Sequence, residues 1–152
     1  MCLVAANVLC SGLGLFEGVE NTVDAGITRD GTMHKMTFEQ WNQVIQTNLT
    51  SCFNMCRGVI DGMRERGFGR IVNIGSIVGL RGNTGQAAYA AAKAGLVGFS
   101  ASLAREVARK GVTVNTVSPG YIQSPLIMAV PERIREGIKG QIPVGRFGDP
   151  SE

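Results

Sequence analysis

Two side chains in the middle of the chain have types and a spacing that suit proton transfer. Tyr89 and Lys93 are four residues apart in the stretch YAAAK, so on a helix they lie one turn apart on the same side. A free phenol has a pKa of about 10, and a neighbouring ammonium group lowers it by charge. The pair has the chemistry of a general acid beside its activating partner. The same letters also fit a plain helical turn whose lysine extends outward to water.

Ser76 and Asn48 extend this set. Ser76 follows a short apolar run, and a serine hydroxyl can hold a carbonyl oxygen. Asn48 falls inside the apolar arc of a predicted helix, about 20° from Trp41, where a buried amide needs hydrogen-bond partners. One interpretation is an amide bound to neighbouring backbone. The other is an amide that holds the helix open for a water molecule relaying protons to Lys93.

The first long helix is predicted over residues 38–66. Thr37 can cap its start, and Gln40 is in the position of a capping-box partner. Glycines at 67 and 69 end it. Trp41 and other apolar residues recur along it at helical spacing, so one face should be buried.

A strand, a helix and a second strand follow. The runs RIVNIG at 70–75 and VTVNTV at 112–117 are rich in β-branched residues, and a helix is predicted between them over about 86–110. Such a crossover makes the two strands parallel and adjacent, which indicates an open α/β sheet. Ligands of such sheets bind at the carboxyl ends of the strands. Ser76 and the stretch SPG at 118–120 fall at those ends, and Tyr89 opens the helix between them.

Composition argues against several other classes of protein. The net charge is +3 with no long Lys/Arg run, so nucleic-acid binding is not expected. Four cysteines without a framework and the single His34 give no metal site and fit a reduced cytoplasmic setting. The apolar N-terminal run has no preceding Lys or Arg and is too short to cross a bilayer, so neither export nor a membrane span is predicted.

Four stretches together resemble the short-chain dehydrogenase/reductase family in order and spacing: TNLTS at 47–51, GS at 75–76, YAAAK at 89–93 and NTVSPGYI at 115–122. The resemblance covers about residues 25–152. It implies a partial Rossmann-like, doubly wound parallel sheet, with 24–152 as the catalytic part and the first βαβ units missing. For a complete protein it also implies a homo-oligomer, a dimer or tetramer, formed through the helices 38–66 and 86–110.

Within the family, the chain is similar to bacterial reductases of 3-oxoacyl-[acyl-carrier-protein] and of acetoacetyl-CoA. The stretches AGITRDGTMHKM and IPVGRFGDPSE carry this similarity. It implies NADPH-dependent reduction of a 3-oxoacyl thioester on acyl carrier protein, with NADH not excluded as the cofactor. The alternatives are an acetoacetyl-CoA reductase of polyhydroxyalkanoate synthesis and a truncated, non-catalytic remnant that associates with a full-length paralogue.

The resemblance also assigns roles to single residues. Tyr89 would protonate the substrate carbonyl oxygen, and Lys93 would lower the pKa of Tyr89 and bind the nicotinamide ribose. Ser76 would orient the carbonyl, and Asn48 would support the water relay. Further cofactor contacts would come from Asp24, Ala25, Gly26, Pro119, Gly120, Ile122 and Ser124.

The amino-terminal part departs from the family pattern. The glycine-rich turn that binds the cofactor diphosphate is absent, and Gly12-Leu13-Gly14 lacks the family spacing. Residues 1–23 are therefore predicted to be an atypical leader without a family match. Its VENT stretch, residues 19–22, is judged too polar for a buried parallel strand.

Overall fold

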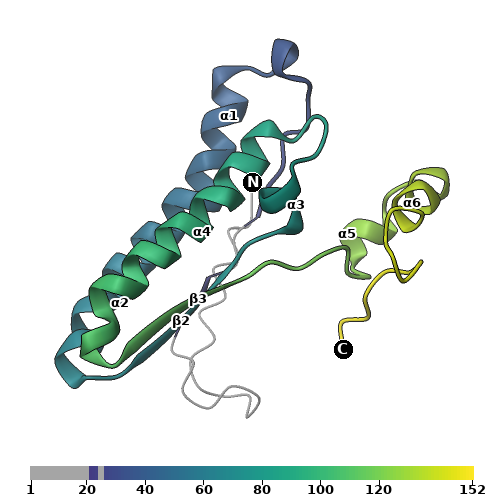
Figure 1. Cartoon of the computed structure of the whole chain (residues 1–152). Coiled ribbons are helices and arrows are strands. Elements are labelled where there is room, and N and C mark those ends of the chain that lie inside the picture. Colours follow the sequence, from purple (N-terminus) through teal and green to yellow (C-terminus); the bar gives the residue numbers. More distant parts are fainter. Residues whose placement is uncertain (1–20, 24–25) are drawn as a thin grey trace. The chain divides into compact units, whose positions relative to one another are not determined.

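The computed structural model describes residues 21–23 and 26–152, which form two compact units divided between Ser118 and Pro119 (Figure 1). The rest of the predicted leader, residues 1–20, lies outside the described residues, as do Asp24 and Ala25.

The first unit contains a parallel three-stranded sheet in the order β1-β2-β3. The strands are β1 (Asn21–Val23), β2 (Gly69–Ile74) and β3 (Val112–Val117). Residue 71 pairs with residue 114, and the pairing continues in register to 74 and 117. The prediction of two adjacent parallel strands at 70–75 and 112–117 is confirmed.

The expectation that VENT forms no strand is wrong. Asn21 to Val23 form β1 and pair in parallel with β2, with Asn21 opposite Ile71. The ladder is made by backbone N–H and C=O groups, so a short polar segment can join it. Among the described strands β1 lies at the edge, where burial demands less of the side chains than in a central strand.

Helices cover one face of this sheet. The predicted helix 38–66 consists of α1 (Phe38–Ile45), a π-helical turn η2 (Gln46–Thr50) and α2 (Ser51–Arg66). Thr37 caps it through the predicted capping box with Gln40. Gly67 ends it at φ 70°, in the left-handed region that favours glycine. The predicted helix 86–110 is α4 (Ala87–Val107) with the 3₁₀ turn η3 (Ala108–Lys110).

The core lies between the strands and the helices α2 and α4, which run side by side in Figure 1. Alternate residues of β2 and β3 face it, with Ile71, Val112 and Val114 buried. Met63 of α2 and Val107 of α4 pack on them. This alternation is what a sheet covered on that face requires. The partial Rossmann-like α/β fold expected from the sequence is confirmed. A short helix, α3 (Ile77–Arg81), follows β2, and a 3₁₀ turn, η1 (Met33–Lys35), precedes α1.

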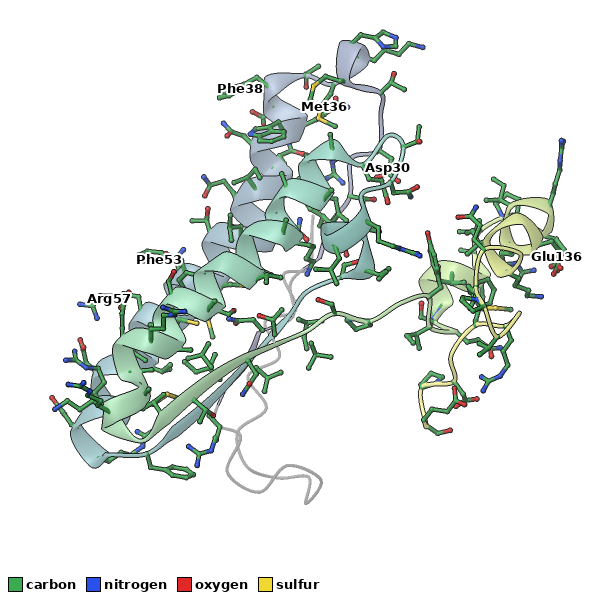
Figure 2. All side chains as sticks on the ribbon, viewed as in Figure 1. Asp30, Met36, Phe38, Phe53, Arg57 and Glu136 are labelled. Carbon is green, nitrogen blue, oxygen red and sulfur yellow. The ribbon has the colours of Figure 1, made fainter. Side chains whose placement is uncertain are left out.

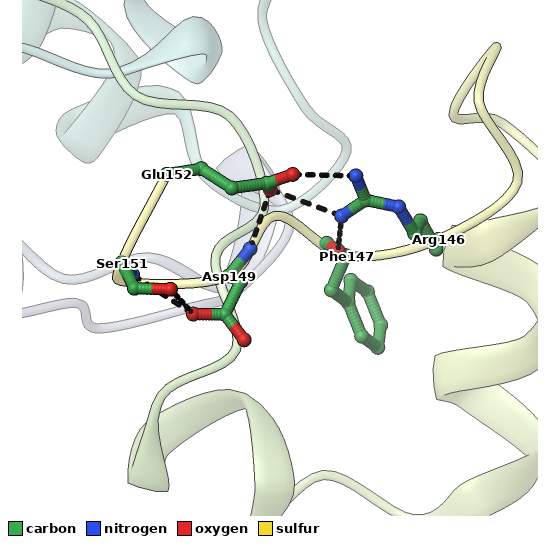
Figure 3. A network of polar contacts seen from close by, with 5 residues as sticks. All are labelled: Arg146, Phe147, Asp149, Ser151 and Glu152. Carbon is green, nitrogen blue, oxygen red and sulfur yellow. Dashed lines mark hydrogen bonds and ion pairs between the residues drawn. The ribbon is translucent and has the colours of Figure 1, made fainter.

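The second unit, residues 119–152, contains α5 (Pro125–Met128) and α6 (Glu132–Lys139). Its two ends are joined by a bridge between Ile122 and Gly148. Close to its end the Arg146 guanidinium donates to the Glu152 carboxylate at 2.6 and 3.0 Å (Figure 3). These bonds lower the pKa of Glu152 to about 2, and the Asp149 N–H adds a third bond to that carboxylate.

Candidate active site

Lys93 is buried at the carboxyl end of β2, with only 2% of its surface exposed. Its ammonium nitrogen donates a 2.8 Å hydrogen bond to the Ile74 carbonyl oxygen, on the last residue of β2. The same nitrogen lies 5.8 Å from the centre of the Tyr89 ring. The interpretation of Lys93 as a side chain that extends outward to water is therefore wrong. The lysine points inward, towards the end of β2 and the Tyr89 ring.

The alanines of YAAAK explain how the Tyr89 turn comes so close to its neighbours. Ala88 and Ala92 are buried in one cluster with Val44 of α1, and the half-buried Tyr89 packs against the same cluster. A methyl group fills little space, so α4 approaches α1 closely here. Tyr89 is thereby held on two sides, by the cluster and by Lys93.

Ser76 caps the short helix α3 directly after β2. Its backbone is extended, and its Oγ accepts a 3.2 Å hydrogen bond from the Val78 N–H. The next turn of α3 rests on α4, because a Cβ on Gly79 would lie 2.8 Å from both the Ala94 nitrogen and the Lys93 carbonyl carbon. The helix that carries Ser76 is thus fixed against the very turn that carries Lys93.

Asn48 is fully buried in the π-helical turn η2. Its Nδ2 donates to the carbonyls of Ile27 (2.9 Å) and Val44 (2.8 Å), and its Oδ1 accepts from the Ile27 N–H at 3.2 Å. These are the backbone partners that the first interpretation of Asn48 required. The side chain ties the segment after β1 to the helix, and π-helical turns of this kind are frequent at functional sites.

The predicted cofactor residues fall in different parts of the chain. Gly26 lies near Asn48, since a Cβ on it would be 3.8 Å from Asn48 Oδ1. Pro119, Gly120, Ile122 and Ser124 belong to the second unit, where Ser124 Oγ caps α5 by accepting from the Ile127 N–H at 3.4 Å. Within the first unit the structure therefore brings Tyr89 and Lys93 together, and it places Ser76 two residues beyond the Ile74 carbonyl that Lys93 contacts. Asn48 holds the helix that packs beside Tyr89.

Sequence reasoning missed two features of this site. The first is the Ile74 carbonyl, a backbone group that no letter of the sequence marks. The second is a buried polar contact beneath α4, in which Asn73 Nδ2 donates to Ser100 Oγ at 2.8 Å. A signal for it was present, because Asn73 is the only neutral polar side chain in the run RIVNIG.

The described residues also bear on two other kinds of site. No group of three or more His, Cys, Asp or Glu residues in this part of the chain could hold a metal ion. No helix within residues 21–23 and 26–152 combines the length and apolar character that crossing a membrane needs.

Comparison with known proteins gives a consistent result. A family model described as short chain dehydrogenase matches residues 19–135. The acetoacetyl-CoA reductase of Shinella zoogloeoides is 58% identical over 130 residues, which are 85% of this chain and 54% of the relative. The 3-oxoacyl-[acyl-carrier-protein] reductase FabG of Vibrio cholerae is 51% identical over 138 residues, 90% of this chain and 57% of the relative.

The FabG protein of Escherichia coli K12 is 52% identical over 129 residues, 85% of this chain and 53% of the relative. The chain thus spans about half the length of the curated relatives it matches. The family match covers most of the chain, including the strands β1 to β3 and the turn with Tyr89 and Lys93. The chain therefore belongs to the short-chain dehydrogenase/reductase family.

Proposed function

We propose that this chain carries the proton-transfer half of an NADPH-dependent reductase that converts a 3-oxoacyl thioester into the 3-hydroxyacyl thioester. The observation that supports this most is the buried Lys93 ammonium beside the Tyr89 ring at the end of β2. A phenol held next to a buried cation is a stronger acid than a free phenol. That is the property a proton donor to a carbonyl oxygen needs near neutral pH.

We assign to the residues the roles that the family resemblance implies. The Ser76 hydroxyl and the Tyr89 phenol hold the carbonyl oxygen of the substrate. As the carbonyl carbon gains a hydride, the electron pair of the C=O π bond moves to the oxygen, which takes the phenol proton. The Lys93 ammonium stabilises the phenolate that remains. Asn48 keeps η2 in place, so that a water molecule there can return a proton towards Lys93.

The residues present fit a nicotinamide cofactor in part. An ammonium at a strand end suits the hydroxyl groups of a ribose, and Lys93 offers it at the end of β2. Pro119, Gly120, Ile122 and Ser124 would line the nicotinamide, and Asp24, Ala25 and Gly26 would lie near the adenosine. When bound, the cofactor supplies the hydride. We propose NADPH, as the sequence resemblance implies.

The substrate proposal rests on the names of the relatives. The FabG proteins, 51% and 52% identical to this chain, are named as reductases of 3-oxoacyl-[acyl-carrier-protein], and the Shinella relative, 58% identical, is named as an acetoacetyl-CoA reductase. We propose the carrier-protein thioester as the substrate, with acetoacetyl-CoA as the alternative. Steady-state rates with the two thioesters, in the chimeric enzyme described next, separate them by the ratio of kcat/KM.

A chimera tests the catalytic proposal. Residues 26–152 would replace the matching segment of the Shinella acetoacetyl-CoA reductase, and oxidation of NADPH would be followed with each thioester. We expect turnover in the chimera, and a loss of at least about 100-fold in kcat when Tyr89→Phe is introduced, since general acid catalysis contributes about 10²–10⁴-fold. NADPH binding should persist in that variant. Turnover that survives the substitution would contradict the proton-donor role.

The isolated chain tests the alternative of a non-catalytic remnant. Titration of NADPH, followed by its fluorescence, shows whether the 152 residues bind the cofactor without a further segment. We expect weak binding or none. Saturable binding in the micromolar range would instead make the chain self-sufficient in cofactor binding.

We also propose that the chain associates through α2 and α4. A hollow of about 390 Å³ lies between these helices, with Phe53, Ile60 and Phe99 among its lining residues. Phe53 is 51% exposed and, like Arg57, points away from the sheet in Figure 2. A second copy or a full-length paralogue would cover this surface. Sedimentation of the chain and of Phe53→Asp tests it, with a shift to monomer expected for the variant.

A further inference from the structure

Helix α4 is attached to strand β2 by two polar bonds. Lys93 donates to the Ile74 carbonyl at 2.8 Å, and Asn73 donates to Ser100 at 2.8 Å. Lys93 and Ser100 are seven residues apart, which is about two helical turns, so they lie on the same face. Leu96 lies between them, and all three are buried. The adjacent β2 residues Asn73 and Ile74 thus bind α4 at two positions about two turns apart.

The Asn73 amide is the centre of this attachment. It is fully buried on β2, and besides Ser100 it contacts α2, where the Cys56 thiol lies 4.0 Å from Asn73 Oδ1. One side chain therefore joins a strand and both covering helices. Apolar side chains position a helix by shape, and cores tolerate swaps of similar volume. A hydrogen bond to a single hydroxyl adds a directional constraint on how far the helix lies along the strand.

We propose that Asn73 is a positioning residue for the Tyr89–Lys93 pair. Its bond to Ser100 fixes how far α4 lies along β2, and so fixes where the Lys93 ammonium meets the Ile74 carbonyl and the Tyr89 ring. The proposal rests on the function proposed above, because it assumes that Lys93 acts on the Tyr89 phenol.

Thr116 provides a matched control. It is the partner of Asn73 in the pairing of β2 with β3, so it lies beside Asn73 on the face under α4. Its Oγ1 is buried and makes no hydrogen bond to any of the described residues. Thr116→Val removes this hydroxyl with little change in shape. This variant therefore removes a buried polar group next to Asn73 but breaks no hydrogen bond to α4.

The test uses the titration of Tyr89 itself. The chain has two tyrosines, Tyr89 and Tyr121, so Tyr121→Phe leaves the Tyr89 phenol as the sole tyrosine signal in ultraviolet absorbance. In this background we expect Asn73→Leu to raise the titration midpoint of Tyr89 by about 0.5 pH unit or more, a threefold weaker acid. Asn73→Thr, which replaces the amide donor with a hydroxyl donor and suits a strand, should return the midpoint most of the way to its value with asparagine. Thr116→Val should leave the midpoint unchanged.

Folding is checked by circular dichroism in each variant. If Asn73→Leu does not fold, Ser100→Ala decides, because it removes only the accepting oxygen and should raise the midpoint in the same direction. An unchanged midpoint in a folded Asn73→Leu or Ser100→Ala chain overturns the proposal. Lys93→Gln distinguishes failure of the proposed function from failure of the positioning role. If Lys93→Gln leaves the titration midpoint of Tyr89 unchanged, the proposed proton-transfer pair fails. If Lys93→Gln shifts the midpoint but the Asn73 and Ser100 variants do not, only the positioning role of Asn73 fails.

Discussion

The ammonium nitrogen of Lys93 lies 5.8 Å from the centre of the Tyr89 ring, inside the protein and at the end of β2. A charge in such surroundings is screened less than one in water, so it acts on a neighbouring phenol more strongly. The arrangement depends on three segments of the first unit: the alanine-rich start of α4, the last carbonyl of β2, and the capped helix α3.

Gly79 keeps α3 in contact with α4. We expect Gly79→Ala to lower the free energy of unfolding by about 1–3 kcal/mol, because the new methyl group meets the backbone of Lys93 and Ala94. Gly58→Ala is the control, because Gly58 lies within α2 with open space around it. Alanine at this position should raise the free energy of unfolding by about 0.5–1 kcal/mol. Urea unfolding measures both. Equal effects would mean that α3 does not press on α4.

Asn48 holds the segment after β1 through two hydrogen bonds to Ile27, and it donates a third to the Val44 carbonyl of α1. We expect Asn48→Ala to lower the free energy of unfolding by at least about 2 kcal/mol, since it leaves the Ile27 N–H and two carbonyls without this partner. Asn54→Ala, at an exposed position of α2, should change it by less than about 0.5 kcal/mol. A similar cost in urea unfolding for both variants would contradict the role of Asn48.

Cys56 should be unreactive in the folded chain. Burial raises its pKa to about 11 from an ordinary value of 9.0, so little thiolate forms near pH 8. We expect iodoacetamide to label Cys56 in urea but only slowly under native conditions, as read by peptide mass spectrometry. Equal labelling rates in the two conditions would show that the α2 core is open.

The same shift of the Cys56 pKa predicts a direction for stability at alkaline pH. The folded state favours the neutral thiol, so its contribution is fully present below about pH 9 and is lost as pH rises towards about 11. Unfolding followed between these values should therefore show falling stability. Cys56→Ala should reduce that slope, and an undiminished slope would assign it to other groups.

Much of the first unit could be predicted from sequence because its signals are local. The capping box at Thr37, the glycine after Arg66 and the β-branched runs fixed the ends of helices and strands to within a few residues. The polar segment at β1 was misjudged because pairing there depends on backbone groups and not on side-chain polarity. The π-helical turn at Asn48 cannot be predicted from the sequence. Its hydrogen bonds join residues five apart and not four apart, and so short a change leaves the spacing of the apolar residues almost unaltered.

The site could be predicted less completely. The spacing of Tyr89 and Lys93 placed them on one side of a helix, but whether Lys93 faces water or the sheet depends on a carbonyl of another element, Ile74. The contact of Gly79 with α4 likewise joins segments that sequence periodicity treats separately. The family resemblance supplied the roles of these residues, and the structure supplies the contacts that make those roles physically reasonable.

The most direct test of the central claim is the titration of Tyr89 with and without its lysine. In the Tyr121→Phe background, the phenolate absorbance should rise with a midpoint below the value of about 10 for a free phenol. Lys93→Gln should move that midpoint upward, to about 10 or above, while circular dichroism shows the fold retained. A Tyr89 phenol that titrates at the same pH with lysine or glutamine at position 93 would contradict the account.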